Sequence, residues 1–114
     1  MAANCVFCKI IAGEIPSTFV HRGEDVVAIE DSNPQAPAHV LVMPVKHVAN
    51  LSEFTDTEGA QAVAELFGIA SRLGRKQGTK GFRIVINSGA QGGQTVDHLH
   101  VHVLSGRQMQ WPPG

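Results

Sequence analysis

The segment DHLHVHVL, residues 97–104, alternates histidine with aliphatic residues. This alternation predicts a β-strand, because successive side chains of a strand point to opposite faces of a sheet. The three histidines are therefore expected on one face and the aliphatic residues between them on the other. Half of the six histidines of the chain fall in this segment. They can mark a metal site, a catalytic strand or the polar face of an ordinary strand.

Strand geometry and side-chain chemistry favour the catalytic interpretation. The α-carbons of His98 and His102 are expected roughly 13 Å apart, at about 3.3 Å per residue. A tetrahedral zinc ion suits two such neighbours, so a simple three-histidine metal centre is disfavoured. An ordinary polar strand face carries valine, threonine or lysine more often than three histidines. A neutral imidazole, with a pKa of about 6.5, is a good nucleophile when its other nitrogen is held by a partner.

The rest of the chain predicts an α+β domain around this strand. Thr55 and Glu58 match a capping box, and apolar residues from Val63 to Gly74 recur with helical spacing up to a terminator at Gly78. Further β-branched or apolar runs predict strands at residues 18–22, 26–30, 39–44 and 82–86, the first two as a hairpin. We expect about five antiparallel strands, one long helix and a short N-terminal helix, in a single domain over residues 1–114.

Composition argues against partners that are recognised by bulk charge. Nine basic residues balance ten acidic ones, so duplex nucleic acid and an anionic membrane surface are not expected partners. Residues 72–83 hold five of the nine cations and are interpreted as a solvated helix end and loop. No apolar run approaches the roughly 20 residues of a membrane span, and the N-terminus lacks a secretory pattern. A reducing, cytoplasmic setting is expected, in which Cys5 and Cys8 are thiols or metal ligands.

The glycine-rich stretch SGAQGGQT, residues 88–95, leads directly into the histidine segment. Glycine backbone N–H groups can approach phosphate oxygens closely and form a cradle for them. The stretch lacks the Gly-Lys-Ser/Thr ending of a P-loop and is followed by a strand rather than a helix. Glycines often only turn the chain, but three same-face histidines next to them favour phosphate binding.

These motifs resemble the histidine triad superfamily. HLHVHVL, residues 98–104, matches its alternating histidine signature, and the closing GRQMQWPPG resembles the branch of purine nucleoside phosphoramidases. The resemblance covers essentially the whole chain. It implies a homodimer with one continuous sheet and hydrolysis of the P–N bond of adenosine or guanosine phosphoramidates. The chemistry needs no metal, because an imidazole supplies the nucleophile and backbone donors stabilise the phosphate charge.

The resemblance also implies roles for individual residues. His100, the middle histidine, is expected to form a nucleotidyl-histidine intermediate, and Asp31 to take the ribose hydroxyls. The other residues expected at the nucleotide are Phe7, Ile10 and Ile29 at the base, His39 near the active site, Asn87, Gly93, Gln94, Thr95 and His102 at the phosphate, and Trp111 in the tail that reaches the partner. Asp97 stands where this branch commonly has an aromatic residue, which leaves the breadth of substrates open.

The Cys5-x-x-Cys8 pair leaves three interpretations open. A redox pair is the least favoured, since no βαβ pattern surrounds it; inert thiols and a structural zinc site remain. Some superfamily members bind zinc through such a pair together with histidines that correspond to His47 and His98. Two other functions compete with the phosphoramidase: a nucleotide- and zinc-binding interaction module that needs no turnover, and a dinucleoside polyphosphate hydrolase of the same superfamily.

Overall fold

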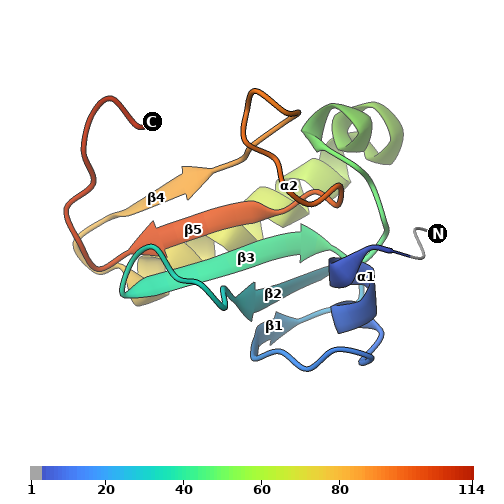
Figure 1. Ribbon diagram of the computed structural model, residues 1–114, viewed down its shortest axis with the longest axis horizontal. Helices are drawn as coiled ribbons and strands as arrows, with labels where there is room; N and C mark the ends of the chain where they lie inside the picture. Colours follow the sequence, from blue (N-terminus) through green and yellow to red (C-terminus); the bar gives the residue numbers. More distant parts are fainter. Residues whose placement is uncertain (1–3) are drawn as a thin grey trace.

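The computed structural model describes residues 4–114 and shows a five-stranded antiparallel sheet with two helices (Figure 1). The strand order is β1-β2-β3-β5-β4, so β1 and β4 form the edges. The α+β fold expected from the sequence is confirmed. The strands are β1 (Phe19–Arg22), β2 (Val26–Glu30), β3 (Ala38–Pro44), β4 (Phe82–Val85) and β5 (Val101–Ser105).

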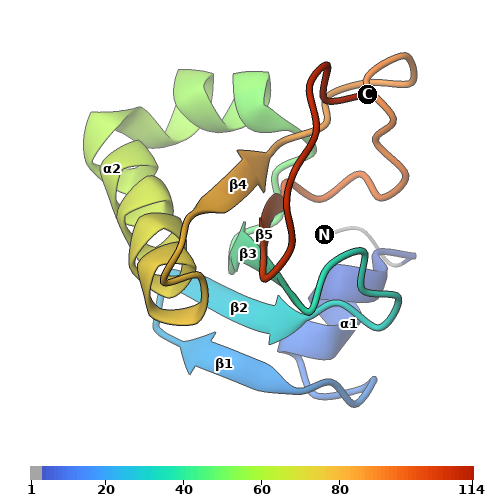
Figure 2. The same ribbon diagram turned by 90° about the vertical axis from the view of Figure 1, so that its left-hand side faces the viewer.

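The two helices cover opposite faces of the sheet (Figure 2). The long helix α2 (Leu51–Gln77) packs on one face, and the short helix α1 (Val6–Ile11) packs on the other. Alternate residues of the central strands pack into two separate cores. Val40 and Val42 face α2, whereas Leu41 and Met43 face α1. Both faces of β3 are therefore covered, as its nearly continuous apolar sequence predicts.

Helix α2 begins earlier than its sequence pattern predicts, so the capping box at Thr55 is wrong. The helix starts at Leu51, and the side chain of Asn50 accepts a hydrogen bond from the Glu53 N–H at 2.9 Å. The Glu53 carboxylate in turn accepts from the N–H of Ala49 at 3.0 Å. Asn50 and Glu53 thus satisfy backbone N–H groups at the helix start, and the observed cap lies five residues before the predicted one.

A break at Gly59 explains why the periodic face of α2 begins only after it. Gly59 has φ 84° and ψ 171°, which are not helical values and which a residue with a Cβ rarely adopts. Near the other end, a Cβ on Gly74 would lie 2.5 Å from the ring of Phe82. This glycine lets α2 approach β4 closely. No helix within residues 4–114 is both long and apolar enough to cross a membrane.

We expect Asn50→Ala to lower the free energy of unfolding by about 1 kcal/mol, because it removes the side-chain cap of α2. The measurement is urea unfolding followed by circular dichroism. Thr55→Ala is the matched control: Thr55 lies inside the first turns, where its hydroxyl donates to the Ser52 carbonyl at 3.0 Å. Equal losses in both variants would contradict the cap assignment.

Candidate functional site

The histidine segment is only partly a strand. β5 begins at Val101, so His98 and His100 precede it and only His102 lies within it. The strand expected from residue 99 is therefore two residues too long at its start. The alternation itself is confirmed, because the intervening Leu99, Val101 and Val103 all belong to the core beneath α2. The histidines lie toward the α1 side, where Phe7 of that helix packs against His98 and His100.

His100 is held in one tautomer by its own segment. Its Nδ1 lies 2.8 Å from the carbonyl oxygen of His98. A carbonyl can only accept, so Nδ1 carries the proton and donates it, which leaves the lone pair of the neutral ring on Nε2. The ring is 7% exposed and lies edge-on to Phe7 at 4.9 Å between centroids. This arrangement fits a nucleophile whose reactive nitrogen is fixed in direction.

A second chain of contacts fixes the tautomer of His102. The N–H of Gln35 donates to Nδ1 of His39 at 3.0 Å, so the proton of the neutral His39 ring is on Nε2. That nitrogen lies 3.0 Å from Nδ1 of His102 and 3.4 Å from Oδ2 of Asp31. His102 accepts at Nδ1 and therefore carries its own proton on Nε2. The centroids of the His100 and His102 rings are 5.0 Å apart.

Burial keeps His39 and His102 neutral near pH 7. Burial, together with nearby His100 and His39 and against a smaller opposite effect of Asp31, lowers the pKa of His102 to about 4. Burial also lowers the pKa of His39, against a smaller opposite effect of Asp31. The His39–Asp31 contact is therefore one in which a neutral ring N–H faces a carboxylate oxygen, rather than an ion pair. A neutral His102 with its proton on Nε2 can donate to a phosphate oxygen.

The glycine-rich loop lies beside these histidines but uses part of its own backbone internally. The N–H of Gly93 donates to the Ala90 carbonyl at 3.1 Å. The side-chain amide of Gln94 donates to Ala49 at 2.6 Å and to Val96 at 3.0 Å. Gln94 thus braces the loop against the start of α2. Within residues 4–114, neither the amide of Asn87 nor the N–H and hydroxyl of Thr95 pairs with another protein group.

The residues expected at the base and at the partner lie in different surroundings. Phe7, Ile10 and Ile29 are all buried in the core beneath α1. Trp111 is 82% exposed at the end of the tail and does not join the histidines of its own chain. The structure therefore gathers His39, His100, His102, Asp31 and Phe7 and leaves Trp111 outside. Main-chain groups of Gln35 and His98 set the tautomers of His39 and His100. Such main-chain contacts cannot be recognised from the sequence.

The four sequence-predicted metal ligands converge on one point. Their donor atoms all lie within 4.8 Å of one another. Nδ1 of His98 is 3.4 Å from Cys5 Sγ, 3.5 Å from Cys8 Sγ and 3.2 Å from Nδ1 of His47, which is itself 3.3 Å from Cys8 Sγ. A tetrahedral zinc ion with usual bond lengths separates its ligands by about 3.5 Å (S···N) and about 3.3 Å (N···N). The donor set therefore fits zinc in both chemistry and spacing.

The surroundings of this Cys5–Cys8–His47–His98 cluster favour metal ligation over redox chemistry. Nε2 of His98 donates to the carbonyl of Pro44 at 2.8 Å, which leaves Nδ1 as the acceptor inside the cluster. Burial lowers the pKa of His98. Burial and the neighbouring Cys5 raise the pKa of Cys8 to about 11, so its thiol is protonated unless a cation displaces the proton. Both cysteines are free.

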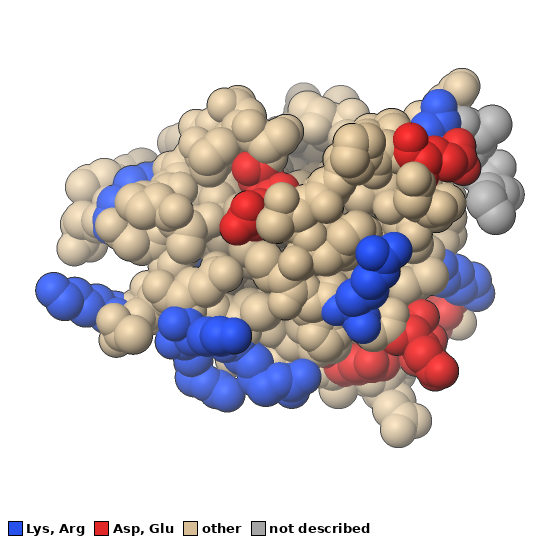
Figure 3. All heavy atoms as spheres, turned by 90° about the horizontal axis from the view of Figure 1, so that it is seen from below, with Lys and Arg blue, Asp and Glu red and all other residues tan. Residues whose placement is uncertain are grey.

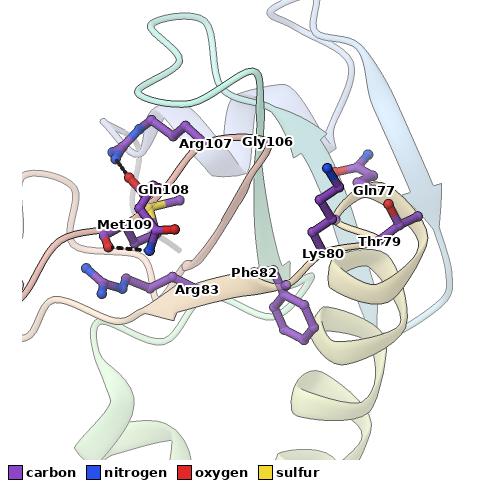
Figure 4. Close-up of a pocket in the computed structure, with 11 residues that line it drawn as sticks. Gln77, Thr79, Lys80, Phe82, Arg83, Gly106, Arg107, Gln108 and Met109 are labelled. Atoms are coloured by element: carbon purple, nitrogen blue, oxygen red, sulfur yellow. Dashed lines mark hydrogen bonds between the residues drawn. The ribbon is translucent and has the colours of Figure 1, made fainter.

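The hollows of the surface differ in lining. One of about 210 Å³ is lined in part by Asp31 and His39. A hollow of about 330 Å³ opens beside Cys5 and His47, with Asp97 at its edge. A larger one, of about 520 Å³, lies between the start of β4 and the C-terminal tail (Figure 4). Lys80 lies on one side of it and Arg83 and Arg107 on the other. Lys and Arg also predominate toward one end of the lower face (Figure 3). Among the described residues, no histidine or cysteine lines the hollow of about 520 Å³.

Comparison with known proteins assigns the family. The HIT domain model matches residues 12–109, and the chain belongs to this family. An uncharacterized HIT-like protein of Synechococcus elongatus is 44% identical over 115 residues, covering 100% of both chains. A 14 kDa zinc-binding protein of maize (Zea mays) is 44% identical over 111 residues, covering 96% of this chain and 87% of that one. The crystal structure of a HIT family hydrolase from Legionella pneumophila superposes with a TM-score of 0.91 at 43% identity, covering 97% of this chain and 100% of that one.

Proposed function

We propose that the chain is a hydrolase that cleaves the P–N bond of purine nucleoside phosphoramidates through His100. The observation that carries this proposal is the 2.8 Å contact from Nδ1 of His100 to the His98 carbonyl, which leaves the lone pair on Nε2 for nucleophilic attack. The hydrolase name of the Legionella relative supports the general class of reaction. The phosphoramidate specificity comes from the resemblance of the motifs and is the part to be tested.

The proposed reaction has two displacements at the α-phosphorus. In the first, Nε2 of His100 forms a bond to phosphorus while the P–N bond breaks, and the leaving nitrogen takes up a proton from water. In the second, water attacks the nucleotidyl-histidine, releasing the nucleoside monophosphate and restoring the free imidazole. The Nε2–H of His102 and the Thr95 N–H would stabilise the charge on the phosphate oxygens. The Nδ1–H bond to the His98 carbonyl stabilises the positive charge that His100 gains during attack.

The direct test is to incubate the purified chain with adenosine 5′-phosphoramidate, without added metal, and to follow AMP release by chromatography. Steady multiple turnover is expected. A chain that binds AMP but releases none from adenosine or guanosine phosphoramidates would overturn the proposal. That result would favour a nucleotide- and zinc-binding module. Turnover of diadenosine polyphosphates in preference to phosphoramidates would favour the rival hydrolase instead.

We propose further that the Cys5–Cys8–His47–His98 cluster holds a structural zinc ion. The ligand spacing and the Pro44 carbonyl behind His98 support this, as does the zinc-binding name of the maize relative. The cysteine thiolates would neutralise the ion and the two Nδ1 atoms would complete its coordination. Bound zinc would tie α1 to the histidine segment. The reaction steps themselves use His100 and His102.

A homodimer through β4 is the proposed assembly. β4 is an edge strand, so its outer backbone groups have no partner strand within residues 4–114. Val85 on this strand is half-buried yet belongs to neither core cluster. An uncovered edge of this kind favours pairing with a second copy.

We expect Val85→Lys to convert the dimer to a monomer, because a charge at a strand edge opposes pairing. Size-exclusion chromatography with light scattering would show the mass fall by half. His21→Lys, a half-buried position on the opposite edge strand β1, is the control and should leave the mass unchanged. A wild-type chain that is monomeric at micromolar concentration would contradict the proposed assembly.

A further inference from the structure

We infer that the Cys5–Cys8–His47–His98 cluster positions the nucleophile, so that cation binding at the cluster and nucleotide binding at His100 are energetically coupled. The inference rests on the proposed function and adds regulation of the same site. It follows from the position of His98, one residue shared by both sites. Its side chain is in the cluster and its main-chain carbonyl holds His100.

The segment that contains His98 and His100 makes few other hydrogen bonds with the rest of the chain. The ladder between β3 and β5 ends at Val42 and Val101, and that between β4 and β5 ends at Val85 and His102. His98 and His100 therefore lie just outside the sheet. Within residues 4–114, and besides the packing of Leu99 in the core, the polar contacts that place them are the Leu99 N–H to the Val48 carbonyl at 2.8 Å, the Pro44 contact of His98, and the cluster. A change in the cluster is thus transmitted directly to the residue that fixes the His100 ring.

Helix α1 provides a second connection. Cys5 caps the helix and Cys8 lies within it, while Phe7 packs edge-on against His100 at 4.9 Å and against His98 at 6.0 Å. The helix has six residues, which is too short to be stable without tertiary contacts. A cation that binds both cysteines would fix α1 on the sheet and with it the ring of Phe7 against the nucleophile.

The cluster is accessible to a cation from solvent. The hollow of about 330 Å³ beside Cys5 and His47 reaches the surface at Thr95 and Asp97, both exposed. The carboxylate of Asp97 lies at this edge and attracts cations. Thr95, expected at the phosphate, lines the same hollow. Entry of the cation and the phosphate end of the nucleotide site are therefore neighbours, which again predicts that each site responds to the other.

Coupling of two binding sites is reciprocal, so it can be measured without turnover. We would titrate the full chain with Zn²⁺ against a chromophoric chelator, with and without saturating AMP. AMP is expected to change the Zn²⁺ affinity by about fivefold or more, and Zn²⁺ to change the AMP affinity by the same factor. A spectroscopic readout is the NMR signal of the His100 ring nitrogens, which should shift on Zn²⁺ addition, whereas those of His39, remote from the cluster, should not.

Variants separate the coupling from a general loss of structure. His47→Ala removes a ligand that contacts neither α1 backbone nor His100, and it should abolish the effect of Zn²⁺ on AMP affinity; His21→Ala, on β1, should retain it. Equal Zn²⁺ affinities with and without AMP, failure to bind Zn²⁺, or failure to bind AMP would each overturn the inference. Coupling in a chain that hydrolyses no phosphoramidate would refute the proposed reaction alone. Turnover without coupling would refute this inference alone.

Discussion

His100→Ala is expected to reduce turnover of adenosine 5′-phosphoramidate by about a thousandfold or more, equivalent to about 4 kcal/mol of transition-state stabilisation. The reason is that Nε2 of His100 is the proposed site of the covalent bond, so its removal eliminates the two-step path. The two neighbouring histidines of the motif are held in other contacts. The proton of His102 is on Nε2 because its Nδ1 accepts from His39, and Nδ1 of His98 lies among Cys5, Cys8 and His47.

The measurement is single-turnover AMP release, compared with AMP affinity in the same preparation. His100 is 7% exposed, so alanine leaves a cavity beside Phe7; retained AMP binding and an unchanged circular dichroism spectrum show that the variant is folded. Gln108→Ala, in the tail and away from the histidines, is the matched control. Turnover in His100→Ala within tenfold of wild type would show that another group is the nucleophile.

The strands were predictable because their patterns are local. Residues 26–30 and 39–44 carry apolar runs that a buried strand requires, and both strands form there. The start of α2 was not predictable from the capping-box pattern, because Thr55-Glu58 and Asn50-Glu53 both resemble helix starts. The choice between them depends on the break at Gly59 and on tertiary contacts of the first turns.

In the candidate site, too, the residues that form a sequence motif were predictable, whereas the tertiary contacts were not. The convergence of Cys5 and Cys8 on His47 and His98 was expected from the resemblance, and the structure places the four together. What sequence could not show is the main-chain chemistry. The tautomers of the rings depend on backbone groups of Gln35, Pro44 and His98, and a main-chain contact leaves no pattern of side chains in the sequence. The placing of Gln94 at the phosphate stays a prediction; the hydrogen bonds of its amide to Gly89 and Ala49 are tertiary contacts that the sequence does not reveal.

Acid is expected to destabilise the fold, chiefly through His102. Its pKa is about 4 in the folded chain, lowered by burial, whereas an unfolded histidine titrates near 6.5. Between these values the unfolded state binds a proton that the folded state does not, so the free energy of unfolding falls as pH decreases. The contribution is fully present above about pH 6.5 and is lost progressively down to about pH 4. Allowing for the partial exposure of the ring, it amounts to about 2 kcal/mol. His39, whose pKa is also lowered by burial, adds in the same direction.

Urea unfolding at pH values from 7 to 4, with a chelator present to remove any effect of bound cations, measures this contribution. His102→Asn provides the comparison, because asparagine cannot take up a proton and its amide can still accept from His39. Carboxylates titrate in both proteins, and their effect cancels in the difference. The wild type should therefore lose about 2 kcal/mol more than the variant between pH 7 and 4. Parallel curves would show that His102 has the same pKa in both states, which is incompatible with a ring buried between His39 and His100. Since the same burial keeps His102 neutral for its phosphate contact, the result also tests the electrostatic basis of the proposed site.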